Sequence, residues 1–295
     1  MRKILITGSR GFIGSHLKTE LIRRNYSPIE INTPEGNILD KNTLYKYSGD
    51  DICYVFHLAG KTFVPESWSE PLEFYETNTM GTANVLEFCR TRNVPITYVS
   101  AYLYGQPSKL PITESDSLVP NNPYAHSKYL AEQLCAFYAK EFNVAIKILR
   151  PFNIYGIGQN EKFLVPYLIK QALYEDVIRV KDLLPKRDYV YIDDVIEALV
   201  LTISHQPPFA IFNIGSGISF SAQEVIDTIQ GILGTEKRVV SENAARRNEL
   251  NNVVADISRA RKELQWIPKH SLREGLARII RYEKENMAHK RKVVC

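Results

Sequence analysis

Short apolar runs alternate with runs that have helical spacing along the first half of the chain. KILIT (residues 3–7) is apolar and rich in β-branched residues, and GFIGSHLKTELIRR (11–24) follows it with apolar positions three and four residues apart. Strands that are apolar throughout, each followed by a helix, are typical of a parallel sheet covered on both faces. We therefore predict an α/β fold. The further strands that we expect are SPIEI (27–31), CYVFHLAG (53–60), PITYVSAYLYG (95–105) and VAIKILRPFNIYG (144–156), and the further helices are PLEFYETNTMGTANVLEFCRTR (71–92) and PYAHSKYLAEQLCAFYAKEF (123–142).

The alternation changes after residue 156. From residue 218 on, the chain is more charged and its pattern is mostly helical. We predict that residues 1–156, with 190–213 returning to them, form one domain, and that 157–189 and 214–295 form a smaller lobe over the strand ends. Within this part we expect a helix over EKFLVPYLIKQALY (161–174), a strand and then a helix within KRDYVYIDDVIEALVLTI (186–203), and a strand that ends in a turn at AIFNIGSG (210–217).

Composition narrows the classes of protein. The 295 residues are 44% hydrophobic and 24% charged with a net charge of +4, so a sizeable core is expected and disorder is not. No basic stripe is interleaved with aromatic residues, so we expect no nucleic-acid partner. The apolar run at the N-terminus is too short for a signal peptide and no run is long enough for a membrane span, so we expect a cytoplasmic protein without a membrane partner. The four cysteines, none in a C-x-x-C pair, predict neither a metal site nor a disulfide framework and are Cys53, Cys89, Cys135 and Cys295.

Three glycines follow the first strand at intervals of three residues. Gly8, Gly11 and Gly14 lie between a strand and a helix, where a tight turn, a close approach of backbone amides and close packing of the helix would bind a pyrophosphate. An ordinary glycine-rich loop is the alternative. We favour the dinucleotide site because strand, glycines and helix occur in that order.

A tyrosine and a lysine lie one helical turn apart in NPYAHSKYLAEQ (122–133). Tyr124 and Lys128 therefore share one face of the predicted helix. They could form a surface pair on an amphipathic helix. They could also form a site in which the ammonium group makes the phenol usable as an acid or base.

Taken together, the motifs resemble those of the extended short-chain dehydrogenases/reductases, in the group of nucleotide-sugar epimerases, dehydratases and reductases. The resemblance covers nearly the whole chain. It implies a Rossmann-like, doubly wound parallel sheet that binds NAD(P) through the larger domain, and a C-terminal lobe that binds a sugar nucleotide. It depends on TGSRGFIG, VFHLAG, FYETNTMGTANVLEFC, YVSAYLYG, PYAHSK, LRPFNIYG, RDYVYIDDV, FNIGSG and ADISRARKELQWIP, in this order.

The resemblance assigns catalytic roles to Ser100, Tyr124 and Lys128. Tyr124 would be the general acid/base, Lys128 would lower its pKa and hold the nicotinamide ribose, and Ser100 would hydrogen-bond to the sugar oxygen. A free tyrosine titrates near ~10, so substantial ionisation at neutral pH needs a shift of roughly three units, worth about 4 kcal/mol. We expect this lowering to come from Lys128 and from the positive ring of the oxidised cofactor.

The end of the second strand bears on cofactor choice. Family members normally carry an acid there that grips the adenosine ribose. Here Asn32 takes that place and does not repel a 2′-phosphate, while Arg10 lies close to where that phosphate would be. NADP(H) is therefore favoured over NAD(H), although Arg10 could be an exposed loop residue. The resemblance adds to the cofactor contacts Phe12, Ile13, Asn37, Ile38, Leu58, Ala59, Gly60, Lys61, Asn78 and Pro151.

A sugar nucleotide also needs groups that bind its diphosphate and its sugar. The resemblance assigns the diphosphate to Arg187 and Arg246, with the neighbouring Arg247 as a substitute; arginine suits this role because it binds phosphate in bidentate fashion. A solvated basic run is the alternative at the second position. The other substrate contacts that the resemblance implies are Val64, Glu66, Ser67, Ala101, Tyr102, Asn153 and Phe163.

The two residues after Ser100 bear on the reaction. In the family's 4,6-dehydratases an Asp-Glu pair stands there, and enzymes resembling GDP-fucose synthase carry a cysteine at the second position. Ala101 and Tyr102 supply neither group, which argues against dehydration and against C3/C5 epimerisation. HLAGKTFVPESW (57–68) and NEKFLVPYLIKQ (160–171) resemble segments of GDP-6-deoxy-mannose reductases, and Phe163 replaces the asparagine usual in UDP-galactose 4-epimerases.

We therefore expect an enzyme that reduces a 4-keto-6-deoxy sugar nucleotide by hydride transfer at C4. A 4-epimerase of the UDP-glucose type with tightly bound NAD is the first alternative, and a non-catalytic NAD(P)-binding protein is the second. The resemblance also implies a homodimer formed through a four-helix bundle that includes 123–142. Among other candidates, we expect His57 to be a core residue, His126 to face solvent, and Asp193 and Asp194 to cap a helix rather than bind metal.

Overall fold

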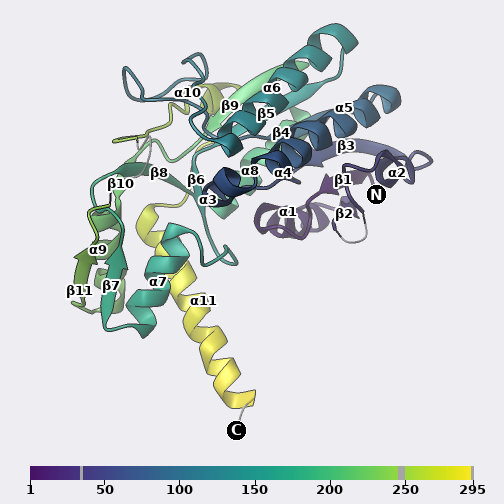
Figure 1. The fold of residues 1–295 in the computed structure, drawn as a ribbon. Helices are drawn as coiled ribbons and strands as arrows, with labels where there is room; N and C mark the ends of the chain where they lie inside the picture. Colours follow the sequence, from purple (N-terminus) through teal and green to yellow (C-terminus); the bar gives the residue numbers. More distant parts are fainter. Residues whose placement is uncertain (34–35, 245–249, 294–295) are drawn as a thin grey trace.

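The centre of the molecule is a sheet of six parallel strands. The computed structural model describes residues 1–33, 36–244 and 250–293, with side chains up to residue 286. The strands lie in the order β2-β1-β3-β4-β5-β9, and each pairs with its neighbours in parallel (Figure 1). This confirms the predicted Rossmann-like parallel sheet. Its strands are β1 (Lys3–Thr7), β2 (Ser27–Ile31), β3 (Ile52–His57), β4 (Ile96–Val99), β5 (Ile146–Pro151) and β9 (Phe209–Ile214).

The strand order reverses direction at β1. From β1 the chain adds β2 on one side and then crosses over to place β3 on the other side. The loops that follow β1 and β3 therefore diverge at the carboxyl edge of the sheet, where doubly wound folds bind their ligands. Every residue of β4 and β5 is buried, as expected for central strands that are covered on both faces.

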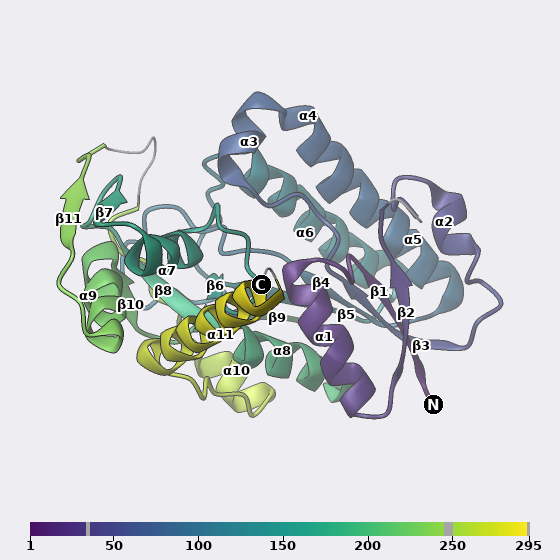
Figure 2. The same cartoon turned by 90° about the horizontal axis from the view of Figure 1, so that it is seen from below.

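Helices cover both faces of this sheet. Figure 2 shows α1 and α8 on one side and α5 and α6 on the other, and α1 packs against α8 as α5 packs against α6. The helix predicted over 71–92 is helical throughout, but it contains a π-helical turn, η1, in its middle. The helices of this part are α1 (Phe12–Arg23), α2 (Lys41–Tyr45), α3 (Val64–Ser69), α4 (Pro71–Phe74), η1 (Tyr75–Met80), α5 (Gly81–Arg92), α6 (Pro123–Phe142), α8 (Ile192–Leu201) and η2 (Thr202–Ser204).

Two small sheets and three helices lie at the left and below in Figure 1, and the short helix α10 (Ser258–Glu263) lies in the upper part, beside β9; with the two sheets these four helices complete the described part of the chain. One sheet has the order β10-β8-β6 and the other pairs β11 with β7. Helix α11 projects away from the main sheet (Figure 1). The elements are β6 (Asn153–Tyr155), α7 (Leu164–Tyr174), β7 (Val177–Val180), β8 (Lys186–Tyr191), β10 (Ser219–Ser221), α9 (Ala222–Leu233), β11 (Arg238–Ser241), α10 (Ser258–Glu263) and α11 (Leu272–Val293).

Two sequence expectations need correction here. The strand expected over 144–156 is divided at Phe152, because β5 belongs to the main sheet while β6 pairs with β8. The region from 218 on is not only helical, since it contributes β10 and β11. Both errors have the same cause: which sheet a short apolar run joins depends on distant partners that periodicity does not reveal.

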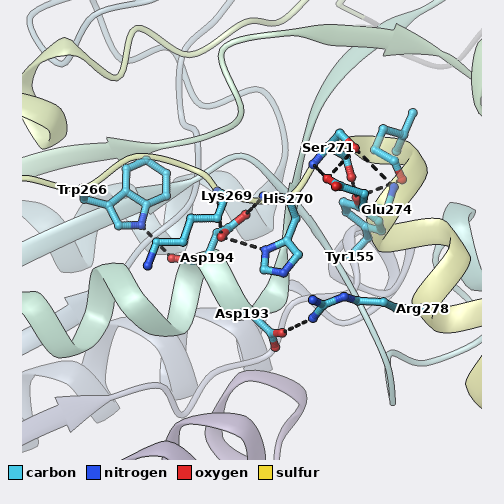
Figure 3. Close-up of polar contacts among 10 residues, drawn as sticks. Tyr155, Asp193, Asp194, Trp266, Lys269, His270, Ser271, Glu274 and Arg278 are labelled. Carbon is cyan, nitrogen blue, oxygen red and sulfur yellow. Dashed lines mark hydrogen bonds and ion pairs between the residues drawn. The ribbon is translucent and has the colours of Figure 1, made fainter.

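The helix-capping prediction for Asp193 and Asp194 was also wrong. Helix α8 has no side-chain cap. Instead Asp194 is buried and accepts hydrogen bonds from the backbone N–H groups of Lys269 and His270 and from the His270 ring, at 2.9 to 3.1 Å (Figure 3). The indole of Trp266 donates to the Asp194 carbonyl oxygen at 2.8 Å. Asp194 therefore binds the segment before α11 to helix α8, which covers one face of the main sheet.

The structure also places the described cysteines and the two histidines considered above. Cys89 and Cys135 are buried in the core, Cys53 is partly buried against it, and Cys295 lies outside the described residues. His57 is fully buried and His126 is exposed, as expected. No described helix is both long and apolar enough to cross a membrane.

Candidate functional site

The glycine-rich turn packs tightly against the loop that follows β3. Gly8 has a positive φ of 74°, and a Cβ there would lie 2.8 Å from the backbone nitrogen of Ala59. A Cβ at Gly14 would lie 2.2 Å from the carbonyl oxygen of Gly8. Helix α1 thus begins in contact with the turn, and no side chain caps its N-terminus at Gly11. This cradle fits a dinucleotide, because the first amides of α1 can face a pyrophosphate at close range.

Asn32, which follows β2, braces the glycine-rich turn. Its Oδ1 atom accepts the Arg10 backbone N–H at 2.8 Å, and its Nδ2 atom donates to the Ser9 hydroxyl at 2.8 Å. The nearby carboxylate of Glu30 accepts a hydrogen bond from the Ser9 hydroxyl and forms an ion pair with Lys18. Both contacts lower the pKa of Glu30, and Lys18 is the larger cause. The end of β2 therefore presents a carboxamide to the turn, in the place where an acid was expected for an NAD enzyme.

Asn78 joins the loop after β3 to helix α6. Its Oδ1 atom accepts the Lys61 backbone N–H at 2.9 Å, and its Nδ2 atom donates to the Lys61 carbonyl oxygen and to the Ser127 hydroxyl. Asn78 lies in the π-turn η1, which places its side chain between these two segments. The loop that carries Leu58, Ala59 and Gly60 is thereby held against the helix of Tyr124 and Lys128.

His57 lies beneath this loop as a neutral, hydrogen-bonded ring. Its Nδ1 atom is 2.7 Å from the Thr7 hydroxyl and its Nε2 atom is 2.9 Å from the Thr82 hydroxyl. Thr82 donates its own proton to the Asn78 carbonyl oxygen, so Nε2 carries the ring proton and Nδ1 accepts. Burial, aided by the charge of Lys128, lowers the pKa of His57 to about 3. This residue supports the site and takes no proton at neutral pH.

Lys128 is buried at the carboxyl edge of the sheet. Its Nζ atom donates to the Val99 carbonyl oxygen at 2.7 Å and lies over the Tyr98 ring, 4.6 Å from its centroid. The same atom is 3.7 Å from the position of a Cβ at Gly60. Burial lowers the pKa of Lys128 to about 8, while the charge of Glu132 acts in the opposite direction.

Tyr124 lies one helical turn before Lys128, with its ring edge-on to Phe74. Burial raises the pKa of Tyr124, and the phenol of Tyr102 adds to the effect. Burial thus opposes the lowering of this pKa that is expected from Lys128 and the oxidised cofactor together. Tyr124 therefore holds its proton at neutral pH in this structure.

Ser100 completes the predicted catalytic set. The serine follows β4 directly, and its backbone N–H donates to the Leu149 carbonyl oxygen at 2.8 Å. Its side-chain oxygen is buried and has no hydrogen-bond partner among the described residues. A buried hydroxyl without a partner is costly in a finished core, so its oxygen is suited to bind a ligand.

Tyr102 stacks on Phe152 with ring centroids 5.4 Å apart and planes at 24°, and Ala101 beside it is partly buried. Asn153 donates to the Asp188 carbonyl oxygen at 3.3 Å.

Arg187, the first expected phosphate-binding arginine, is partly buried and donates to the carbonyl oxygens of Lys186 and Leu250. Arg246, the second expected phosphate-binding arginine, and Arg247 lie outside the described residues.

The loop expected to cover the sugar forms the short helix α3. Val64 is partly exposed, and Glu66 pairs with Lys61 at 2.9 Å. Ser67 is fully buried and its hydroxyl donates to the Val64 carbonyl oxygen, so this side chain is turned away from solvent. Phe163 precedes α7 and packs edge-on against Phe63.

The remaining expected cofactor contacts lie near the turns described above: Phe12 and Ile13 begin α1, Asn37 and Ile38 precede α2, and Pro151 ends β5.

Sequence reasoning missed a buried polar network beside the catalytic set. Arg150 in β5 and Glu132 in α6 form an ion pair, and Tyr104 contacts the same guanidinium group. A signal was present, because Arg150 interrupts an otherwise apolar strand and Glu132 follows Lys128 by one helical turn. Within the described residues no cluster of three or more His, Cys, Asp or Glu side chains could hold a metal ion.

Known proteins share this fold at sequence identities near 30%. A model of the NAD dependent epimerase/dehydratase family matches residues 4–215. The chain is 30% identical to the GDP-6-deoxy-D-mannose reductase of Pseudomonas aeruginosa, over 95% of this chain and 96% of that protein. The crystal structure of UDP-glucose 4-epimerase with UDP-glucose from Thermotoga maritima has a TM-score of 0.91 at 29% identity, covering 97% of this chain and 99% of that one. The structure of RMD from Pseudomonas aeruginosa complexed with NADPH has a TM-score of 0.87 at 28% identity, covering 95% and 98%.

The match to the family model spans most of the chain, and the similar proteins cover almost its full length. These proteins include both a reductase and an epimerase, so the comparisons support both kinds of reaction. The chain therefore belongs to the NAD dependent epimerase/dehydratase family, within its nucleotide-sugar epimerases and reductases, and is an enzyme.

Proposed function

We propose that this enzyme reduces the 4-keto group of a nucleotide-diphosphate 4-keto-6-deoxy sugar, with NADPH as the preferred cofactor. The observation that carries the proposal is the meeting of α6 and the end of β4, where Lys128 bonds to the residue before Ser100, the Ser100 hydroxyl has no partner among the described residues, and Tyr124 lies one helical turn before Lys128. Reduction of a ketone needs a proton donor at the carbonyl oxygen, and a protonated phenol is such a donor. Ala101 and Tyr102 supply no carboxylate or thiol for dehydration or C3/C5 epimerisation.

The roles of the chain's residues follow from their positions. When bound, NADPH would supply the hydride that adds to C4 of the sugar. Tyr124 donates its phenolic proton to the ketone oxygen, and water later returns a proton to the phenolate. Ser100 directs its hydroxyl to the same oxygen, and Lys128 stabilises the phenolate and holds the nicotinamide ribose.

The choice of NADPH rests on the end of β2. Asn32 presents a carboxamide rather than a carboxylate, so a 2′-phosphate meets no negative charge from this side chain, and Arg10 is exposed beside it. We assign the cofactor to residues 1–156 with 190–213, and its pyrophosphate to Gly8, Gly11 and Gly14. NAD(H) remains the alternative cofactor, as the name of the family suggests.

The substrate is a nucleotide-diphosphate sugar, which we assign to residues 157–189 and 214–295 together with α3. Arg187 is the described candidate for the diphosphate, with Arg246 as its expected partner. Asn153 lies on the adjoining strand β6, which pairs with β8. These assignments carry over the expectations made from the sequence.

A nucleotide-sugar 4-epimerase is the second candidate. The structural similarity to the UDP-glucose 4-epimerase of Thermotoga maritima favours it, and the set of Ser100, Tyr124 and Lys128 would serve that reaction as well. The non-catalytic NAD(P)-binding role expected as a second alternative is not proposed, because the chain belongs to a family of enzymes.

One experiment distinguishes these functions. The purified enzyme is incubated with NADPH or NADH and a panel of nucleotide 4-keto-6-deoxy sugars, and separately with UDP-glucose and UDP-galactose, while the absorbance of reduced cofactor and the sugar products are followed. Stoichiometric loss of NADPH with one keto sugar supports the reductase. Interconversion of UDP-glucose and UDP-galactose without net cofactor use supports the epimerase. The absence of both reactions contradicts the proposed function.

We also propose that two copies of the chain associate through α5 and α6. Phe137 and Phe142 on α6 are 54% and 44% exposed, although they are large apolar residues. A four-helix bundle formed by two such pairs of helices would cover these rings. Replacing both phenylalanines by lysine should convert a dimer to a monomer in sedimentation experiments, and a monomeric unmodified protein contradicts this association.

A further inference from the structure

Arg150 is a buried cation in the middle of the protein. It lies near the end of β5, where the exposed fractions of the Arg150 and Glu132 side chains are 4% and 3%. Its Nε and Nη2 atoms donate to the Glu132 carboxylate at 2.6 to 3.2 Å. Its Nη1 atom donates to the Tyr104 hydroxyl at 2.8 Å and to the Glu114 carbonyl oxygen at 3.2 Å. The guanidinium group therefore joins three segments: its own strand β5, helix α6 and the segment that contains Tyr104 and Glu114.

Each segment leads to a part of the proposed catalytic set. Glu132 follows Lys128 by one turn of α6, so its carboxylate fixes the helix face that carries the lysine. Tyr104 follows Ser100 by four residues, in the segment that leaves β4. Arg150 itself precedes Pro151, at the strand end expected to contact the cofactor.

Further hydrogen bonds join Tyr104 to the end of β9. The Tyr104 hydroxyl donates to the Asn213 Oδ1 atom at 2.6 Å, and Asn213 at the end of β9 donates from Nδ2 to the Ile112 carbonyl oxygen. The Asn213 backbone N–H donates to the Glu114 carboxylate at 2.8 Å. The segment from Ser100 to Glu114 is thus held against the ends of β5 and β9 by hydrogen bonds of fixed direction.

Stability alone does not account for such a pair. Moving two charges out of water costs about as much as their attraction returns, and apolar residues of similar volume often give an equal or greater stability. A buried ion pair does fix geometry, because its hydrogen bonds tolerate little displacement. We propose that Glu132 and Arg150 are positioning residues, which set Lys128 and Ser100 at the distance from each other that the reaction needs. This inference rests on the proposed catalytic roles of Ser100, Tyr124 and Lys128.

The test is a double variant, Glu132→Leu with Arg150→Met, which removes both charges and leaves neither one buried alone. Its unfolding temperature, NADPH affinity and steady-state kinetics are compared with those of the unmodified enzyme, using the substrate that the panel above identifies. We expect a folded protein that binds NADPH with nearly unchanged affinity and KM. We expect its kcat to fall on the order of 10- to 100-fold, because misplacing reacting groups by about 1 Å has effects of that size.

Three results have distinct meanings. A double variant that folds and keeps its full kcat overturns the positioning role and leaves the proposed function intact. A lowered kcat at unchanged KM and NADPH affinity supports the positioning role. Loss of a purely structural pair would change kcat, KM and NADPH affinity together. An unmodified enzyme without turnover on any substrate overturns the proposed function, and the positioning role with it.

A second variant tests the positioning role if the double variant does not fold. Tyr104→Phe keeps both charges and the ring, and removes only the hydroxyl that links Arg150 to Asn213. Tyr54→Phe is its matched control, because Tyr54 is also a buried phenol whose hydroxyl is hydrogen-bonded, to Thr97 and Thr202, outside the catalytic set. We expect kcat to fall several-fold more in Tyr104→Phe than in Tyr54→Phe at a similar loss of thermal stability. Equal kcat values in these two variants overturn the positioning role.

Discussion

The Nζ atom of Lys128 donates a 2.7 Å hydrogen bond to the carbonyl oxygen of Val99, the residue directly before Ser100. This contact joins the helix that carries the lysine and the tyrosine to the strand that delivers the serine. Helix α6 and strand β4 are separate in sequence, so the three residues of the proposed catalytic set meet only because the fold brings the two elements together.

Tyr124→Phe should remove the proton donor while keeping the aromatic ring. The packing against Phe74 and the position of α6 need no hydroxyl, so we expect the fold and the NADPH affinity to be retained. General acid catalysis by one side chain contributes roughly 10²- to 10⁴-fold, and we expect kcat to fall by that factor. Steady-state turnover and a cofactor titration check this. Turnover at the normal rate would remove Tyr124 from the mechanism.

The activity should decline on the alkaline side near pH 8. Burial lowers the pKa of Lys128 to about 8, so above that pH the amine loses the charge that stabilises the developing phenolate. The charge of Glu132 opposes this lowering, and Glu132→Gln should move the alkaline limb to lower pH. A profile of kcat/KM against pH measures both effects. An alkaline limb at the same pH in both proteins would show that this lysine does not control it.

Asn32→Asp should change cofactor preference from NADPH towards NADH. An aspartate keeps the Oδ1 acceptor for the Arg10 amide but loses the Nδ2 donor to the Ser9 hydroxyl, and its charge repels a 2′-phosphate. We expect NADPH affinity to fall by about tenfold, which corresponds to ~1.4 kcal/mol, with NADH as the internal control. Fluorescence titration of both cofactors measures the ratio. A parallel loss for both would indicate a damaged turn instead.

His57 should make the protein less stable in mild acid. The pKa of the folded ring is about 3, against 6.5 for an ordinary histidine, so below pH 6.5 the unfolded chain binds a proton that the folded one does not. Stability should therefore be lost as pH falls from 6.5 towards 3, by about 2 kcal/mol at pH 5 from this group. Urea unfolding at pH 7.5 and pH 5 measures the loss.

The matched variants for this effect are His57→Gln and His126→Gln. Glutamine at position 57 cannot take up the proton, so its stability should change less between the two pH values. Replacement of the exposed His126 should leave the pH dependence as it is in the unmodified protein. An unchanged pH dependence in His57→Gln would contradict the assignment of a buried neutral ring.

Asp194→Ala should detach the segment before α11 from α8. The carboxylate accepts three hydrogen bonds from Lys269 and His270, and removing it takes the partner from these partly buried donors. Hydrogen bonds to a charged group contribute about 1.5–3 kcal/mol each at most, so we expect a loss of roughly 2–4 kcal/mol in the free energy of unfolding. Asp193→Ala is the control, because its 3.2 Å ion pair with Arg278 is exposed and contributes about 0–1 kcal/mol. Similar losses in the two variants would contradict the anchoring role.

The sequence by itself determined the local features of this enzyme. KILIT followed by three spaced glycines and a helical pattern is sufficient to predict β1, its turn and α1, because propensity and spacing act within a few residues. Tyr124 and Lys128 share a helix face for the same reason, since one turn of a helix brings them together whatever surrounds it. The motif order was enough to indicate the family.

Only the tertiary structure decided how distant groups combine. It divided the strand at Phe152 between two sheets, turned Asp194 from an expected cap into an anchor for residues 266–270, and paired Arg150 with Glu132. It also added burial to the causes that set the Tyr124 pKa, because the cost of burying a phenolate depends on the whole environment of the ring and not on one neighbouring lysine. Burial and long-range hydrogen bonding are properties of the packed chain, so no local pattern specifies them.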